Sequence, residues 1–238
     1  MAPQTVAAAA QAQTSLGHVL WIGGATDSGK TSIAQALAAK YGLHTYHYDR
    51  FDRLEPPGHW ARVDPARHPS MHAWLGGSLD EQWVLTTPEA MAAGWRLTAA
   101  ERFGLTLEDL LALPPGPVIA EGYGLLPELV APFLHSLHQA VWLVPTEDFK
   151  RASYARREQL GGKGRQWPQT SDPARARENH IGRDLLIGQV VIEQAGAAGL
   201  GDNVYIVDGS LTLDETVARV EAHFRPLLPD VCLPAPSV

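Results

Sequence analysis

The amino-acid sequence predicts an α/β protein whose mostly parallel β-sheet has helices on both faces. Five short apolar runs alternate with stretches of helical periodicity along the 238 residues, and this alternation is typical of parallel strands joined by helical crossovers. A glycine-rich loop joins the first apolar run to the first helical stretch, and α/β folds commonly bind ligands at such a turn. The strands are expected at residues 18–22, 44–48, 118–120, 140–144 and 204–207.

The glycine-rich loop matches the pattern G-x-x-x-x-G-K-[ST] at every position. Its residues are Gly24, Ala25, Thr26, Asp27, Ser28, Gly29, Lys30 and Thr31. In this pattern, known as a P-loop, backbone N–H groups surround phosphates, the lysine reaches the β- and γ-phosphate oxygens, and the threonine hydroxyl joins the Mg²⁺ shell. We therefore expect residues 24–32, including Ser32, to bind ATP, with Lys30 also catalytic and Thr31 also a metal ligand.

The segment after this loop predicts a helix that ends near Gly42. Its apolar residues at 33, 34, 37 and 38 share one helical face, and glycine is a frequent helix terminator. A helix that begins at the loop adds its partial positive charge to a phosphate site. The strand, loop and helix together favour a genuine phosphate-binding loop over a chance match.

Composition narrows the classes of function. The net charge of −7 argues against a dedicated nucleic-acid-binding protein. The single cysteine, Cys232, excludes an intrachain disulfide and is typical of a reducing compartment. No apolar stretch is long enough to span a bilayer, and the first 15 residues lack the features of signal and transit peptides. We therefore expect a cytoplasmic protein with no nucleic acid or membrane as partner.

The lengths of the connections predict the domain organisation. We expect a disordered tail at 1–16, one domain at 17–228 and a flexible, proline-rich tail at 229–238. Two connections inside the domain are longer than a single crossover helix needs, and long insertions on such cores usually carry substrate-binding elements or lids. We predict a helical insertion on the acceptor side at 53–113 and a lid region at 150–183.

Acidic residues follow the second and third predicted strands, where ligands bind in doubly wound sheets. Asp49 could orient or deprotonate an acceptor hydroxyl, or bind Mg²⁺ through water, although a helix N-cap would also explain it. Asp52 is a weaker candidate for the same role. Glu121 is expected to support the metal or the attacking group, while Gly122 lets the acceptor approach the backbone. An exposed loop glutamate is the alternative for Glu121.

The lid region is strongly basic. It holds nine of the 19 Lys and Arg residues and three acidic residues, so it carries +6 in a chain of net charge −7. Mobile arginines can close over ATP and stabilise the transferring phosphoryl group. We expect Arg157 and Arg183 to be catalytic, with a solvated helix pair as the alternative.

Two further segments have competing interpretations. Asp208 and Gly209 follow the last predicted strand and could lie beside the adenine, but a turn before a helix capped by Thr212 and Glu215 explains them equally well. The insertion holds several tryptophans, which are expected mostly to form a small helical core, although they could line a planar acceptor pocket. They are Trp60, Trp74, Trp83 and Trp95. Its histidines lack the spacing of a zinc site.

These motifs resemble the small P-loop kinases, a group that includes nucleoside monophosphate kinases, shikimate and gluconate kinases and chloramphenicol phosphotransferases. The resemblance covers residues 18–224 in layout and is specific at residues 24–31, at Asp49 and in the arginine-rich lid. It implies a three-layer P-loop NTPase fold with five parallel strands in the order 2-3-1-4-5. It also implies that Lys30 and Thr31 contact ATP and Mg²⁺, that Asp49 is the acceptor-side carboxylate, and that Arg157 is a lid arginine.

The chain departs from this resemblance in four places. Asp27 replaces the Gly, Ala or Ser more common in the loop; Asp tolerates left-handed backbone angles, but its charge near phosphates is unfavourable unless it points outward. Asp49 and Asp52 are spaced D-x-x-D where shikimate kinases have D-x-D, and residues 121–124 replace a triple glycine. The insertion after Asp49 is also long, which indicates a larger or different acceptor.

The sequence therefore predicts an ATP- and Mg²⁺-dependent phosphotransferase that acts on a small metabolite or an antibiotic. Most of its rate enhancement would come from positioning and electrostatics. Three alternatives stay open: a P-loop protein that sequesters or senses a ligand without phosphoryl transfer, an ATPase or GTPase switch, and a kinase of a nucleotide-sugar or protein resembling zeta-type toxins. No Asn-Lys-x-Asp motif is present, which argues against GTP specificity.

Overall fold

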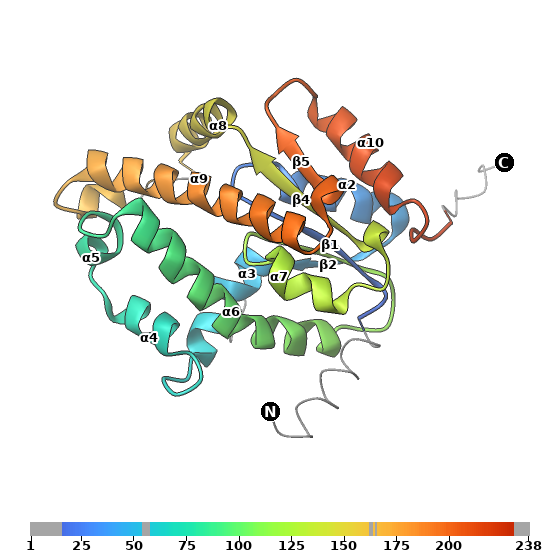
Figure 1. Cartoon of the computed structure of the whole chain (residues 1–238), viewed down its shortest axis with the longest axis horizontal. Coiled ribbons are helices and arrows are strands. Elements are labelled where there is room, and N and C mark those ends of the chain that lie inside the picture. Colours follow the sequence, from blue (N-terminus) through green and yellow to red (C-terminus); the bar gives the residue numbers. More distant parts are fainter. Residues whose placement is uncertain (1–15, 54–57, 162–163, 165, 231–238) are drawn as a thin grey trace.

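The computed structural model describes residues 16–53, 58–161, 164 and 166–230 (Figure 1). The two predicted tails lie almost entirely outside the described residues. Leu16 is an exception, because it is fully buried and packs in the core beside the sheet. The prediction that the first tail reaches residue 16 is therefore wrong by that residue.

A parallel β-sheet forms the centre of the described structure. Its strands are β1 (Val19–Gly24), β2 (His44–His47), β3 (Val118–Glu121), β4 (Ala140–Pro145) and β5 (Val204–Val207). The described strands make a five-stranded sheet with the order β2-β3-β1-β4-β5, and all four pairings are parallel. The predicted strand order is thus confirmed. β1 extends two residues further than expected, and β2 stops one residue earlier because Tyr48 begins the next helix.

Helices surround the sheet. They are α2 (Lys30–Tyr41), α3 (Tyr48–Arg53), α4 (Pro69–Gly76), α5 (Leu79–Trp83), α6 (Pro88–Ala112), α7 (Pro127–Val130), α8 (Glu147–Gln159), α9 (Pro173–Ala197) and α10 (Leu213–Phe224). Single 3₁₀ turns lie at His59–Arg62, Ala131–Phe133, Leu137–Gln139, Trp167–Gln169 and Gly201–Asn203. As predicted, Gly42 terminates α2: the helix ends at Tyr41, and Gly42 caps it in a left-handed conformation with φ of 65°.

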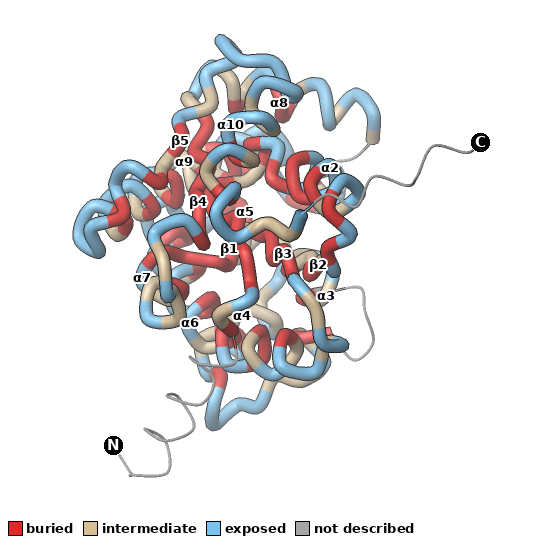
Figure 2. The backbone as a smooth tube through the Cα atoms, turned by 90° about the vertical axis from the view of Figure 1, so that its right-hand side faces the viewer, coloured by how far each residue is buried: buried red, intermediate tan, exposed pale blue. Residues whose placement is uncertain are grey.

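Alternation of side chains along β1 creates two apolar cores, one on each face of the sheet. Val19 and Trp21 pack with residues of α6, α7 and α9. Leu20 and Ile22 pack on the other face with residues of α2 and α10. Figure 2 shows β1, β3 and β4 as the buried centre of the chain trace. The helices therefore cover both faces, in three layers, as the sequence predicts.

The predicted insertion is only partly a separate helical unit. In Figure 1, α4, α5 and the first part of α6 group at one side of the molecule, away from α10. Further along α6, Ala99, Phe103 and Leu110 pack in the core beside the sheet. The remaining small core joins Trp83, Val84 and Met91 of the insertion to Trp167 and to Ala176 of α9. The insertion and the lid region thus share one small apolar core.

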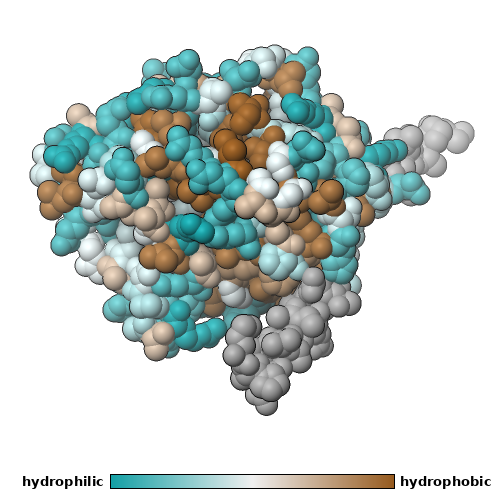
Figure 3. All heavy atoms as spheres, in the orientation of Figure 1, coloured by the Kyte–Doolittle hydropathy of each residue, from teal (hydrophilic) through white to brown (hydrophobic). Residues whose placement is uncertain are grey.

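The surface does not by itself mark a functional site. On the face drawn in Figure 3, hydrophobic residues reach the surface at several places among hydrophilic ones, and isolated exposed apolar side chains are ordinary in folded proteins. None of the helices in the described part of the chain combines the length and the hydropathy needed to cross a bilayer. The candidate site is located instead by a cavity.

Candidate functional site

One large cavity joins the glycine-rich loop, the predicted insertion and the lid region. Its volume is about 1240 Å³, and its wall includes residues 26–33, Asp49, Arg157 and Arg183. Pockets that enclose a single drug-sized ligand have volumes of roughly 300–1,000 Å³. This cavity therefore has room for two ligands side by side, one at the loop and one at the insertion.

Close packing fixes the start of the glycine-rich loop. Gly24 has a φ of 113°, and a Cβ atom there would lie 2.2 Å from the carbonyl oxygen of Leu143 in β4. The Ala25 amide donates a hydrogen bond to that oxygen over 3.1 Å. Gly24 and Ala25 are not among the cavity-lining residues, whereas Thr26 through Ser32 are. These first two residues thus position the loop and do not face the cavity.

The first turn of α2 faces the cavity without a side-chain cap. Gly29 precedes the helix with a φ of 88°, makes no capping hydrogen bond, and no acidic residue lies in the first turn. The backbone N–H groups of a first helical turn have no partners within the helix. Such a turn favours an anion through these groups and the helix dipole.

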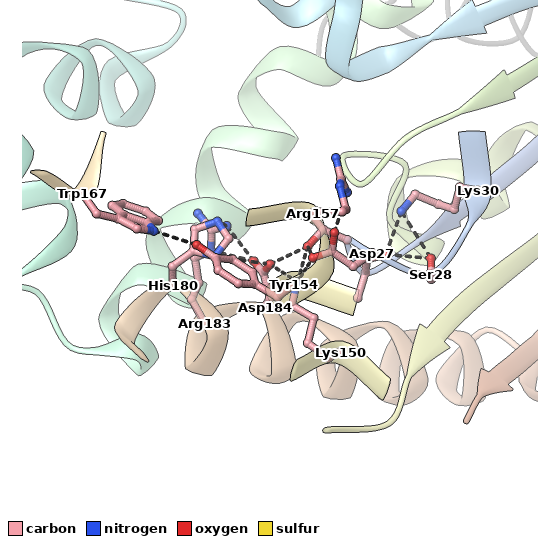
Figure 4. Close-up of polar contacts among 12 residues, drawn as sticks. Asp27, Ser28, Lys30, Lys150, Tyr154, Arg157, Trp167, His180, Arg183 and Asp184 are labelled. Carbon is pink, nitrogen blue, oxygen red and sulfur yellow. Dashed lines mark hydrogen bonds and ion pairs between the residues drawn. The ribbon is translucent and has the colours of Figure 1, made fainter. Parts of the chain in front are cut away.

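Lys30 lies folded back against the loop. Its Nζ atom donates hydrogen bonds to the Ala25 carbonyl oxygen at 2.7 Å and to Ser28 Oγ at 3.5 Å (Figure 4). The side chain is buried, and this burial lowers the pKa of Lys30, while the negative charges of Asp49 and Glu121 act in the opposite direction. A cation in this position is available to interact with an anion at the loop.

Glu121 lies behind the cavity wall and holds Thr31. Its Oε1 atom accepts a hydrogen bond from Thr31 Oγ1 over 3.1 Å and lies 3.0 Å from His47 Nδ1. The residue is 2% exposed, and its Oε2 atom is buried with no hydrogen-bond partner among the described residues. The alternative of an exposed loop glutamate is therefore wrong. No motif in the sequence indicated His47 as a partner of Glu121.

The glycines after Glu121 leave space for the packing of a neighbouring side chain and not for the approach of a ligand. A Cβ atom on Gly122 would lie 2.2 Å from the Cβ of Tyr48, and one on Gly124 would lie 2.1 Å from its Cζ. The Tyr48 side chain therefore occupies the space beside both glycines. Our expectation that Gly122 lets an acceptor approach the backbone is wrong for this reason.

Of the two aspartates after β2, only Asp49 lines the cavity. It lies in the first turn of α3 and not at the cap position before it. Asp52 is buried and forms an ion pair with the buried Arg102. Its Oδ2 atom also accepts a hydrogen bond from Trp60 Nε1 over 3.0 Å. Asp52 therefore anchors the insertion, while Asp49 stays the candidate for acceptor chemistry.

The site offers few oxygen ligands for a metal, which fits a magnesium ion held mainly by phosphates and water. Among the described residues, no group of three or more His, Cys, Asp or Glu could hold a metal. Mg²⁺ commonly needs only one or two carboxylates in addition to substrate phosphates and waters. The Thr31 hydroxyl, the Asp49 carboxylate and the orphaned Oε2 of Glu121 suit that requirement.

A buried network of charges connects the loop to the lid region (Figure 4). Lys150 Nζ lies 2.7 Å from Asp27 Oδ2 and 2.5 Å from Asp184 Oδ2, and all three side chains are buried. Thr26 Oγ1 also donates to Asp184 Oδ2 over 2.5 Å, and Arg157 forms an ion pair with Asp27. Asp27 has the left-handed φ of 65° that we expected. Its charge does not point outward, however, because Lys150 and Arg157 neutralise it inside the protein.

Both favoured arginines line the cavity and are held by carboxylates. The Arg183 guanidinium donates to Asp184 Oδ1 at 3.0 and 2.6 Å and lies 5.0 Å above the Trp83 ring centroid. Arg157, at 47% side-chain exposure, is the more accessible of the two. The alternative of a fully solvated helix pair therefore does not hold for these two residues.

Asp208 and Gly209 lie outside the wall of the large cavity. Asp208 Oδ1 accepts hydrogen bonds from the amide and hydroxyl of Ser210 at 2.9 and 2.6 Å, and these bonds lower the pKa of Asp208. Thr212 and Glu215 form the capping box at the start of α10. The turn and capped helix thus account for these residues. Three neighbours, Val207, Leu211 and Leu213, line the cavity instead.

All four insertion tryptophans line the cavity, and most of them also pack in apolar cores, as expected: Trp95 beside the sheet, Trp83 in the small core, and Trp74 against that core. Trp83 and Trp95 are buried. Sequence reasoning missed Lys150, Asp184, Tyr123 and Trp167 as site residues. One signal was available: Asp184 follows Ala176 and His180 at four-residue intervals on the buried stripe of α9, where an acid is unexpected unless paired.

Comparison with known proteins leaves the family open. No known protein family matches this sequence. No curated protein matches it either. Among solved structures, the crystal structure of an uncharacterized protein from Eubacterium ventriosum aligns with a TM-score of 0.43 and 12% identity, over 87% of this chain and 98% of that one.

Proposed function

We propose that this chain is an ATP-dependent kinase that transfers the γ-phosphoryl group of ATP to a hydroxyl group of a small molecule. The observation that carries the proposal is the single cavity of about 1240 Å³ that places Asp49 in one wall with residues 26–33 and with the insertion. A protein that only binds ATP needs neither the second compartment nor a carboxylate lining it. The second compartment therefore favours transfer over the sensing of ATP alone, and the Asp49 carboxylate, which sequestration of a second ligand would not need, favours transfer over sequestration.

The glycine-rich loop is the inferred phosphate site, and we assign it as a P-loop. Support comes from the full motif in its setting, where β1 leads into residues 24–29 and α2 starts at Lys30. The uncapped first turn of α2 and the Lys30 ammonium group supply positive charge for the β- and γ-phosphates. Parallel strands in the order 2-3-1-4-5 are consistent with a P-loop NTPase fold.

Asp49 is the inferred base for the acceptor. Its carboxylate accepts the proton of the acceptor hydroxyl as the hydroxyl oxygen bonds to the γ-phosphorus. The bond from that phosphorus to the β–γ bridging oxygen breaks, and its electron pair leaves with ADP. Arg157 and Arg183 balance the charge that spreads over the transferring group. Thr31, Asp49 and Glu121 would hold Mg²⁺, which neutralises phosphate charge when bound.

Mass spectrometry tests this proposal. The purified protein is incubated with ATP, Mg²⁺ and pooled nucleosides, nucleotides, sugar acids and aminoglycoside- or phenicol-type antibiotics, and products heavier by one phosphoryl group are sought. We expect such a product with the unaltered chain. Lys30→Ala should lower its rate about 10²–10³-fold, because the substitution removes a charge that stabilises the transition state.

Two matched variants serve as controls. Lys40→Ala removes another lysine of α2, which is half-exposed and paired with Glu221, and should leave the rate unchanged. Asp49→Asn should leave ATP binding unchanged and lower transfer about 10²–10⁴-fold. Asp214→Asn, in the exposed first turn of α10, should leave both ATP binding and transfer unchanged. ATP binding without any phosphorylated product would overturn the proposal, as would full activity of Lys30→Ala.

A further inference from the structure

We propose that the acceptor is an uncharged molecule that carries a planar ring and a hydrogen-bond-accepting oxygen. The inference rests on the proposed function, because the acceptor is the molecule that the kinase would phosphorylate. It concerns the second compartment of the cavity. The compartment is the part of the wall contributed by residues 58–113 together with Tyr123, Trp167, His180 and Arg183. Three independent features of this compartment support the assignment.

The first feature is a continuous row of indole rings, the indole wall, made by Trp60, Trp74, Trp83 and Trp167. Consecutive ring centroids are 5.3, 6.4 and 5.4 Å apart, and each pair meets edge to face. All four residues line the cavity. Indole rings present large apolar surfaces on which planar rings stack favourably. A wall with this composition therefore selects a flat, apolar ring.

The second feature is that the cations of this compartment already have anionic partners. Its described Arg and Lys side chains are Arg102 and Arg183. Arg102 pairs with Asp52, and Arg183 pairs with Asp184. Asp49 adds a negative charge where the compartment meets the glycine-rich loop. Arg102 is held by Asp52, and the proposed function assigns Arg183 to the transferring phosphoryl group, so neither is left to balance a carboxylate or phosphate on the acceptor beside Asp49.

The third feature is a buried hydrogen-bond donor, the indole N–H group of Trp95, that has no acceptor among the described residues. Trp95 lines the cavity, is 7% exposed, and stacks on Tyr123 with ring centroids 5.4 Å apart. Its indole Nε1–H is buried and has no hydrogen-bond partner among the described residues. A buried donor without a partner is unfavourable. An oxygen atom on the bound acceptor would satisfy it.

Isothermal titration with matched pairs of compounds tests the inference, and it does not depend on turnover. The pairs are adenosine and AMP, uridine and UMP, and 2-(indol-3-yl)ethanol and indole-3-acetate, with sorbitol as a non-planar alcohol. Titrations are made with the full chain saturated with ADP and Mg²⁺, so that anions do not simply bind at the loop. We expect the neutral planar members to bind at least about tenfold more tightly than their anionic partners and than sorbitol.

Two variants locate the binding. Trp74→Leu, which interrupts the indole wall, should weaken the neutral planar compounds at least about tenfold. Trp95→Phe keeps an aromatic ring but removes the N–H group, and should weaken only ligands with an accepting oxygen, by about threefold to tenfold. Leu85→Ala changes an exposed residue of the insertion that does not line the cavity, and should leave all affinities unchanged.

The outcomes separate this inference from the proposed function. Neutral planar compounds that bind with the expected pattern support the inference, even if ATP never phosphorylates them. Tighter binding of AMP, UMP or indole-3-acetate would overturn it, even if one of those compounds is phosphorylated. Absence of binding by every neutral planar compound, or unchanged binding in both tryptophan variants, would also overturn it.

Discussion

The ammonium group of Lys150 in α8 lies 2.7 Å from the Asp27 carboxylate in the glycine-rich loop, and neither side chain is exposed to solvent. The same ammonium group contacts Asp184 of α9. One cation therefore ties the loop to the two helices of the lid region. It also removes a negative charge from the place where phosphates would bind.

Replacing Lys150 by Met should destabilise the protein by about 3–5 kcal/mol, because it leaves two buried carboxylates without their shared cation. Urea denaturation monitored by circular dichroism measures the free energy of unfolding. Arg151→Met is the matched control, since Arg151 is the next residue along α8 and its ion pairs with Glu147 and Glu178 are exposed. That control should lose less than about 1 kcal/mol. Equal losses in the two variants would show that the buried network contributes nothing particular to stability.

Replacing Arg157 should have a small effect on stability and a large effect on phosphoryl transfer, unlike the replacement of Lys150. Its ion pair with Asp27 is half-exposed on the arginine side, so Arg157→Ala should cost no more than about 1 kcal/mol in unfolding free energy. If the arginine stabilises the transferring phosphoryl group, the same variant should lower kcat about 10²-fold or more. Arg175→Ala, an exposed change outside the cavity wall in α9, should alter neither quantity. Unchanged kcat in Arg157→Ala would leave that residue a structural role only.

The sheet could be predicted from the sequence because its signals are local. Each apolar run is short and is followed by helical periodicity, and each predicted run overlaps an observed strand. The errors came where the local pattern was ambiguous. Tyr48 is apolar enough to extend β2, yet its packing against Gly122 and Gly124 places it in α3.

The candidate site could be predicted only where one motif or one strand end defines a residue. Lys30, Thr31 and Asp49 belong to this class, and all three line the cavity. Lys150 and Asp27 are 123 residues apart, and no pattern in either segment indicates the other as a partner. The indole wall likewise brings Trp167 to Trp83 from a different part of the chain. Such contacts depend on how the helices pack and not on spacing within a motif.

Gly24 should tolerate no side chain. Its φ of 113° is unfavourable for other residues, and a Cβ atom would lie 2.2 Å from the backbone oxygen of Leu143. We expect Gly24→Ala to lower the free energy of unfolding by about 2 kcal/mol or more. Gly104→Ala is the matched control, because Gly104 lies within α6 with no atom within 4 Å of the added Cβ. It should raise stability by about 0.5–1 kcal/mol. Thermal and urea denaturation compare the two variants, and equal effects would contradict the packing argument.

His59 should make the stability of the insertion depend on pH. The ring is fully buried, with Nε2 at 2.8 Å from Asp109 Oδ2 and Nδ1 at 3.5 Å from Asp52 Oδ1. Burial alone would lower the pKa of His59, but the hydrogen bond to Asp109 and the ion pair with Asp52 outweigh it and raise the pKa above its usual value. Burial would likewise raise the pKa values of Asp52 and Asp109, yet the hydrogen bond from His59 and nearby arginines hold them low. Both carboxylates therefore stay ionised from weakly acidic to alkaline pH.

A group whose pKa is higher in the folded state stabilises that state fully below its unfolded pKa, which is about 6.5 for histidine, and this stabilisation disappears as the pH rises through the folded pKa. The difference in unfolding free energy between the unaltered chain and His59→Gln should therefore be larger at pH 6 than at pH 9. Urea denaturation at the two pH values measures it. His72→Gln, at an exposed position on α4, controls for the exchange of histidine for glutamine. A difference for His59→Gln that is equal at both pH values, or larger at pH 9, would contradict a protonated His59 between the two carboxylates.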